Sequence, residues 1–196
     1  MIVVSICLCI LLSACSGKIP NQEFFIQQAK LSESEKNIVQ LVKGEKQDAI
    51  FDFKVDNKVK GLQVHIYKLK DSQWELVQEG SVPMSNSNGR IAVLCEKMSS
   101  GFDIAVQEEQ GIERITWQGE KQENHDNMGY YRSTLSERTA IEYEQEIPVF
   151  IQIMTSKKEV NSYIVDSFFE PERFAKEGYE GVYAVTVSFL SQSLDA

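Results

Sequence analysis

The stretch 51–55, Phe-Asp-Phe-Lys-Val, decides the fold class of this chain. Apolar and charged residues alternate in it with a period of two, which is typical of a β-strand with one buried face. The stretch 62–67, Leu-Gln-Val-His-Ile-Tyr, has the same alternation. Asp71-Ser72 separates it from a third apolar stretch, 74–77, and this spacing predicts a β-hairpin. The sequence therefore favours a domain built mainly from antiparallel strands.

Strand-like stretches continue to the end of the chain, with turn residues every 8–12 positions. Further strands are predicted at 91–95, 102–106, 112–117, 134–143, 147–154 and 182–190. Residues 147–154 are apolar on both faces, which indicates a central or doubly covered strand. We expect a mainly β (α+β) fold: an antiparallel β-sandwich or curved sheet of about eight or nine strands, with an N-terminal helix and short helices near the C-terminus.

Helices are predicted at both ends of this β region. Residues 33–43 have apolar residues at helical spacing, and the Ser32 and Glu35 pair is typical of a capping box. Residues 24–26, Phe-Phe-Ile, are predicted to form a shorter helix that packs onto the sheet; the alternative is that the Phe pair enters lipid headgroups. Pro171 is expected to open a helix at 171–176, while 160–169 stays ambiguous between helix and strand.

The composition is that of a globular protein that does not bind nucleic acid. Apolar residues make up 42% of the chain, which is outside the disordered range. The net charge of −9 opposes binding to nucleic acid and to anionic lipid, and it favours cationic partners. Maintenance of solubility is the simpler interpretation of this charge.

The first fifteen residues look like a secretion signal. Residues 2–12 are apolar apart from Ser5, and they lead into Leu12-Ser13-Ala14-Cys15. This run is too short to span a bilayer, which needs about 20 apolar residues. The motif resembles the lipobox of bacterial lipoproteins, although the leader lacks the Lys or Arg usual in that class. A buried apolar segment or a plain membrane helix is the alternative.

The lipobox resemblance implies covalent anchoring through Cys15. In that class the Cys thiol receives diacylglycerol, and a peptidase cuts between Ala14 and Cys15. Two acyl chains, at about 0.8 kcal/mol for each buried CH₂, give stable attachment. The implied organisation is a signal peptide at 1–14, a lipidated tether at 15–20 that spans at most ~18 Å, and one extracytoplasmic β-rich domain at 21–196. We expect it at the cell membrane or envelope, close to the lipid surface.

The sequence lacks the common motifs for catalysis and for cofactor binding. The sequence has no Gly-x-Ser-x-Gly, Ser-x-x-Lys or His-Glu-x-x-His motif and no phosphate-binding glycine loop. Cys95, the one Cys left after processing, shares a strand face with Ile91 and Val93 and is interpreted as a small buried hydrophobe. We therefore predict no enzymatic activity, no catalytic residue, no metal and no cofactor apart from the lipid on Cys15.

Five residues are candidates for ligand binding: His65, Tyr67, His125, Tyr130 and Tyr131. His65 and Tyr67 lie on the polar-aromatic face of one predicted strand, although an ordinary surface or sheet-edge position is the simpler interpretation. His125 lies among the carboxylates of loop 119–129, where a hard cation is conceivable but a solvated acidic loop is simpler. The two Tyr residues follow this loop and suit a binding surface or the rim of a core.

These observations leave three functional hypotheses. The first is a membrane-tethered, non-enzymatic module that binds an extracytoplasmic protein, peptide or cell-wall ligand. The second is a subunit of a cell-envelope assembly. The third is a hydrolase with a carboxylate or metal site near residues 120–131, whose geometry a sequence cannot reveal.

Overall fold

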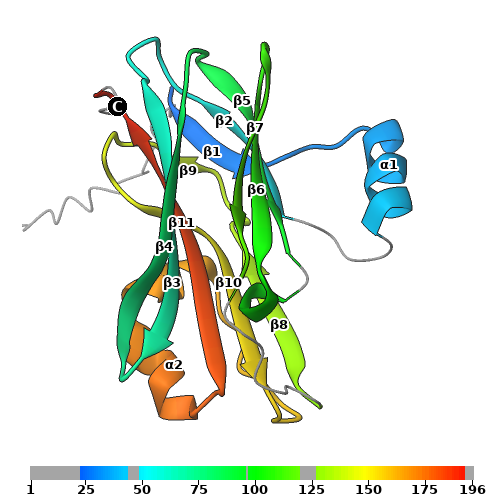
Figure 1. Cartoon of the computed structure of the whole chain (residues 1–196), viewed down its shortest axis with the longest axis vertical. Coiled ribbons are helices and arrows are strands. Elements are labelled where there is room, and N and C mark those ends of the chain that lie inside the picture. Colours follow the sequence, from blue (N-terminus) through cyan, green and yellow to red (C-terminus); the bar gives the residue numbers. More distant parts are fainter. Residues whose placement is uncertain (1–22, 44–48, 96, 120–126, 193–196) are drawn as a thin grey trace, which may run out of the picture.

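The computed structural model describes residues 23–43, 49–95, 97–119 and 127–192. These residues form a β-sandwich of eleven strands in two antiparallel sheets, with two α-helices (Figure 1). The predicted fold class is confirmed, with more strands than the eight or nine expected. The leader, the lipobox with Cys15, the tether and His125 lie outside the described residues. Among the described residues, no helix has the length and apolarity needed to cross a bilayer.

The first sheet has six strands in the order β7-β6-β5-β2-β1-β9. Their bounds are β1 Phe25–Gln28, β2 Ala49–Lys54, β5 Asn88–Leu94, β6 Phe102–Glu108, β7 Gly111–Trp117 and β9 Thr139–Ala140. The second sheet has five strands in the order β4-β3-β11-β10-β8. Their bounds are β3 Gly61–Lys70, β4 Gln73–Pro83, β8 Gly129–Thr134, β10 Ile147–Thr155 and β11 Gly181–Leu190.

The predicted hairpin at Asp71-Ser72 joins β3 to β4. Both turn residues have positive φ, 49° and 66°, which suits the right-handed twist of a two-residue hairpin. The prediction for 147–154 is also confirmed: β10 pairs with β11 on one side and β8 on the other, and all nine of its residues are buried.

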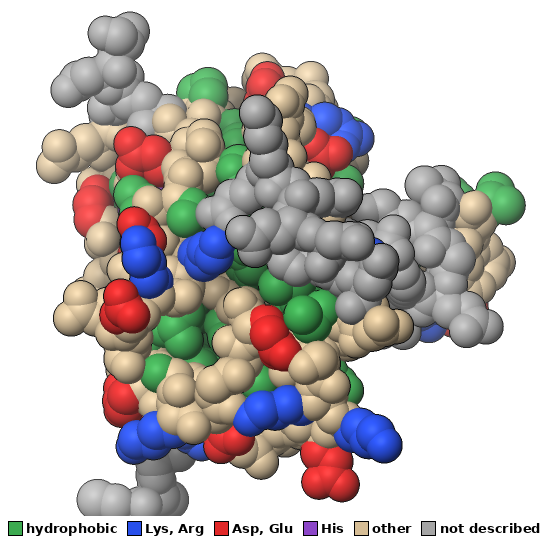
Figure 2. All heavy atoms as spheres, turned by 60° about the horizontal axis from the view of Figure 1, so that its bottom comes forward, with side chains coloured by type: hydrophobic (Ala, Val, Ile, Leu, Met, Phe, Trp, Pro, Cys, Tyr) green, Lys and Arg blue, Asp and Glu red, His purple; other side chains and the backbone are tan. Residues whose placement is uncertain are grey.

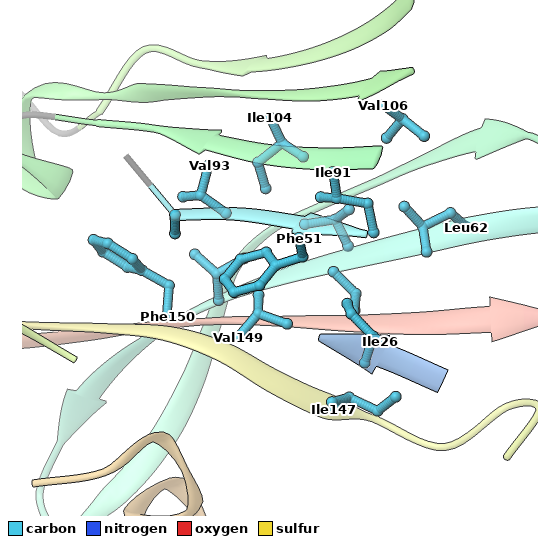
Figure 3. Close-up of a cluster of buried hydrophobic side chains, with 14 of the residues drawn as sticks. Ile26, Phe51, Leu62, Ile91, Val93, Ile104, Val106, Ile147, Val149 and Phe150 are labelled. Atoms are coloured by element: carbon cyan, nitrogen blue, oxygen red, sulfur yellow. The ribbon is translucent and has the colours of Figure 1, made fainter. Parts of the chain in front are cut away.

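The main core lies between the two sheets (Figure 3). Phe51 and Phe53 of β2 point into it from the six-stranded sheet, which confirms the alternation in the opening stretch. Across the sandwich, the ring of Phe53 lies 5.2 Å from that of Phe189 on β11, centroid to centroid. Cys95 is buried in the same core, as expected.

A second apolar cluster lies on the outer face of the five-stranded sheet, at the end drawn lowest in Figure 1. A 3₁₀-helix, η2 Val165–Phe169, and the helix α2 Pro171–Glu177 cover it. The predicted helix at Pro171 is therefore confirmed, and the ambiguous segment before it is a 3₁₀-helix preceded by irregular chain. These elements cover one end of this face; toward the other end the outward-facing Thr186 and Ser188 are buried, and the His65 side chain is 17% exposed.

The helix α1 Glu33–Lys43 stands beside the six-stranded sheet (Figure 1). The predicted capping box is present: the Ser32 amide donates to Glu35 Oε2 at 2.7 Å, and the Glu35 amide donates to Ser32 Oγ at 3.3 Å. Hydrogen bonds from the Ser32 amide and the Arg90 guanidinium lower the pKa of Glu35 to about 2. Arg90 also binds Asp52, so it links the first turn of α1 to β2 and β5.

Two predictions about secondary structure are wrong. Residues 24–26 contribute to strand β1 rather than to a helix, because Ile26 pairs with Phe53 and is fully buried between strands. The predicted strand at 134–143 is reduced to β9, and the strand is instead β8, which pairs with β10. In both places pairing with a distant strand outweighs the local pattern.

Candidate functional site

Next to the end that η2 and α2 cover, the five-stranded sheet carries His65 and Tyr67 on its outer face. Their neighbours in β3, Val64 and Ile66, are fully buried in the core, so alternation directs His65 and Tyr67 outward. His65 pairs directly with Thr186 of β11. The shared outward face of His65 and Tyr67 was expected from the sequence.

Glu146, immediately before β10, joins these side chains into one cluster. Its Oε1 atom lies 2.5 Å from His65 Nδ1 and accepts hydrogen bonds from the Tyr67 hydroxyl at 2.7 Å and the Thr186 hydroxyl at 3.0 Å. His65 Nε2 lies 3.7 Å from Glu79 Oε2 on β4. Three groups from two adjacent strands thus hold a single carboxylate oxygen.

The cluster keeps Glu146 ionised. Burial raises the pKa of the Glu146 carboxyl, but the hydrogen bonds from Tyr67, His65 and Thr186 outweigh it and leave the pKa below its ordinary value. Burial and the same hydrogen bond raise the pKa of the Tyr67 hydroxyl well above its ordinary value. Tyr67 is therefore a proton donor to a carboxylate at neutral pH.

The segment that carries Glu146 is fixed to the ends of the strands. The Tyr143 hydroxyl donates to Asp56 Oδ1 at 2.5 Å, and the Glu144 amide donates to the Phe189 carbonyl at 2.9 Å. Glu144 has a positive φ of 62°, a conformation that residues other than Gly rarely adopt. Its side chain in turn accepts hydrogen bonds from the Ser191 amide and hydroxyl. These hydrogen bonds hold the segment that carries Glu146 in place.

The other carboxylate oxygen, Glu146 Oε2, receives no hydrogen bond from any residue in the described part of the chain. The Glu146 side chain is 30% exposed, and the neighbouring Glu79 side chain is 62% exposed. An ionised carboxylate accepts through both oxygens. The cluster therefore offers a fixed, solvent-reachable acceptor with negative charge.

An aromatic group borders this cluster on the side of η2. The Tyr67 ring lies 5.4 Å from that of Phe168, and Phe168 stacks on Trp74 at 5.2 Å. Trp74 donates through Nε1 to the Phe168 carbonyl, so its indole is engaged beneath η2 and lines no open groove. Phe169, next to this group, is 63% exposed.

Two other candidates, Tyr130 and Tyr131, do not join the cluster. Tyr130 and Tyr131 are neighbours on β8, so their side chains point to opposite faces of the sheet. Lys97 Nζ lies 5.1 Å from the centre of the Tyr130 ring, while Tyr131 is 38% exposed. The two Tyr side chains therefore do not share one face of the sheet.

Hollows elsewhere on the described structure have about the volume of a small ligand. One, of about 410 Å³, lies beside Glu108, whose carboxylate accepts from the Ser85 and Asn86 amides. Another, of about 440 Å³, lies between α1 and the end of β1. Across the described ranges, no group of three or more His, Cys, Asp or Glu side chains could hold a metal ion.

Sequence reasoning missed Glu146, the central residue of the cluster. It lies 81 positions from His65 and outside any strand pattern. Only the pairing of β3 with β11, and of β11 with β10, brings the two residues together. Comparisons of this chain with family models, curated proteins and solved structures found no match. The cluster itself places a fixed carboxylate beside an aromatic group.

Proposed function

We propose that this chain is a membrane-anchored extracytoplasmic lipoprotein whose β-sandwich binds a partner without catalysing a reaction. The lipobox-like sequence that ends at Cys15 supports the anchor. The partner is an extracytoplasmic protein, peptide or cell-wall component. It binds the outer face of the five-stranded sheet through a basic group, such as a Lys ammonium, an Arg guanidinium or the free amine of a cell-wall peptide.

The fixed carboxylate of Glu146 carries this proposal. Three donors hold its Oε1 atom in place, while Oε2 accepts no hydrogen bond within the described part of the chain and the side chain is 30% exposed. A pre-oriented carboxylate loses little conformational freedom when it accepts a charge-assisted hydrogen bond. Exposed Glu79 and the chain's net charge of −9 attract the same kind of partner.

Affinity capture from envelope extract tests the binding site. Residues 21–196 are immobilised as wild type, as Glu146→Gln and as Glu142→Gln, the last being an exposed carboxylate in the same segment. We expect at least one component that the wild type and Glu142→Gln retain and that Glu146→Gln loses by tenfold or more. Equal retention by all three proteins contradicts a role for Glu146.

Lipid labelling tests the anchor independently. Cells that express the full chain are fed a fatty acid carrying an alkyne, and the protein is fractionated with the membranes. Cys15→Ala is expected to abolish both labelling and membrane retention, whereas Cys95→Ala keeps both. Labelling that persists in Cys15→Ala refutes the lipobox assignment.

A further inference from the structure

The helix α1 presents apolar side chains to solvent rather than to the sandwich. Ile38 is 61% exposed and Leu41 is 86% exposed, and they lie three positions apart on one side of the helix. Single exposed apolar residues are common, but a pair one turn apart on an amphipathic helix forms a small apolar surface. Within the described residues no element covers this surface.

The exposed surface has a fixed position relative to the sandwich. The capping box with Ser32 sets the first turn of α1, and Glu35 Oε1 binds Arg90 Nη1 at 2.8 Å. Lys36, Val39 and Gln40 face the 440 Å³ hollow above β1 and β2, so they occupy the inner side of the helix. Ile38 and Leu41 are therefore directed away from the body of the domain.

The charges of α1 set it apart from the rest of this acidic chain. Of its four charged residues, Glu33 is paired with Lys36 at 2.7 Å and Glu35 with Arg90. The helix has no net charge, whereas the chain has −9. Repulsion from anionic headgroups, which opposes approach of most of this domain, is thus weak at α1.

The length of chain between the anchor and the domain puts α1 within reach of the bilayer. Seven residues lie between Cys15 and Glu23, where the described structure begins, and the eight steps from one Cα to the next span at most about 28 Å. Only residues 29–32 separate β1 from α1. From this reach, and on the basis of the proposed anchor, we infer that α1 inserts Ile38 and Leu41 into the headgroup region of the membrane that holds Cys15. The occupant of the apolar surface is lipid, and α1 orients the domain on the membrane.

Fluorescence quenching by labelled lipids tests this inference. The full lipidated chain is prepared with Leu41→Cys carrying an environment-sensitive dye, and separately with Ile112→Cys, which replaces an exposed apolar residue on β7. Unsubstituted protein taken through the same labelling corrects for Cys95. Each protein is reconstituted in vesicles of phosphatidylcholine and phosphatidylglycerol that contain nitroxide lipids, and vesicle flotation is measured in parallel.

We expect the dye at position 41 to be quenched at least threefold more than the dye at position 112. If the protein floats with the vesicles and the two positions are quenched equally, the inference is wrong while the anchor stands. If emission at position 41 shifts to the blue as the protein-to-lipid ratio rises but is not quenched by the nitroxide lipids, a second copy of the chain covers the surface. That result overturns the inference. Failure to float overturns the anchor and the inference with it.

Discussion

At the scale of single residues, Glu146 is the group whose properties depend most on the fold. It acquires its hydrogen-bond donors only when β3 and β11 are paired beside it. Its pKa is below the ordinary value of 4.5 in the folded chain. A carboxyl with a lowered pKa stabilises the fold above its unfolded pKa and loses that contribution as the pH falls through its folded pKa.

Glu146→Gln therefore changes the stability of the protein in a pH-dependent way. At pH 7 we expect the variant to be less stable by about 1–3 kcal/mol, because charge-assisted hydrogen bonds are lost. The difference from the wild type is expected to shrink as the pH falls below 4.5, where the unfolded chain takes up a proton first, and to be smallest below the lower pKa of the folded chain. Urea unfolding at several pH values checks this. A difference that stays constant from pH 7 to pH 3 argues against an ionised Glu146.

Gly101 is a residue whose identity is set by backbone geometry. Its φ is 104°, and a Cβ atom there lies 2.4 Å from the Trp117 carbonyl oxygen. Gly101→Ala is expected to destabilise the fold by about 1–3 kcal/mol. Gly111→Ala is the matched control, since nothing lies within 4 Å of its Cβ position. Equal unfolding midpoints of the two variants contradict this geometry.

At the scale of elements, α1 depends on its link to the six-stranded sheet. An isolated helix of eleven residues is marginal in water, so α1 needs its capping box and the Arg90 bridge. Arg90→Met is expected to speed amide hydrogen exchange in α1 about tenfold or more without changing exchange in β10 and β11. Arg114→Met, on exposed β7, serves as the control. Unchanged protection of α1 in Arg90→Met means that the bridge does not hold the helix.

The elements also show what the sequence could predict. The capping box at Ser32, the turn at Asp71-Ser72 and the apolar strand 147–154 are local signals, and each produced the predicted element. The helix predicted at 24–26 is absent because pairing with β2 makes this part of the chain a strand. For the same reason His65 and Tyr67 could be placed on one face, but Glu146 could not be placed beside them.

At the scale of the whole molecule, the two sheets share one core. The contact of Phe53 with Phe189 crosses it and ties β2 to β11. Phe53→Ala is expected to cost about 3–5 kcal/mol of stability. Because the core is shared, the sheets are expected to unfold together, with far-UV and near-UV circular dichroism giving one midpoint. Separate midpoints in the wild type contradict a single cooperative core.

The two outer faces of the sandwich differ in a way that suits a tethered binding module. The five-stranded sheet carries the Glu146 cluster on its outer face, next to the end that η2 and α2 cover. Figure 2 shows the end of the molecule beneath α2, where Lys, Arg, Asp and Glu side chains surround hydrophobic ones. The six-stranded sheet carries α1, to which we assign the contact with lipid. In the function that we propose, the partner and the membrane therefore contact different sheets.

Photocrosslinking in cells tests the central claim, that the partner binds the face carrying Glu146. A photoreactive residue replaces Ser81, which pairs with Gln63 on that face, or Gln107, which is exposed on the outer face of the other sheet. The account predicts an adduct from position 81 that disappears with Glu146→Gln, and none from position 107. An adduct from position 107 alone, or one from position 81 that survives Glu146→Gln, contradicts it.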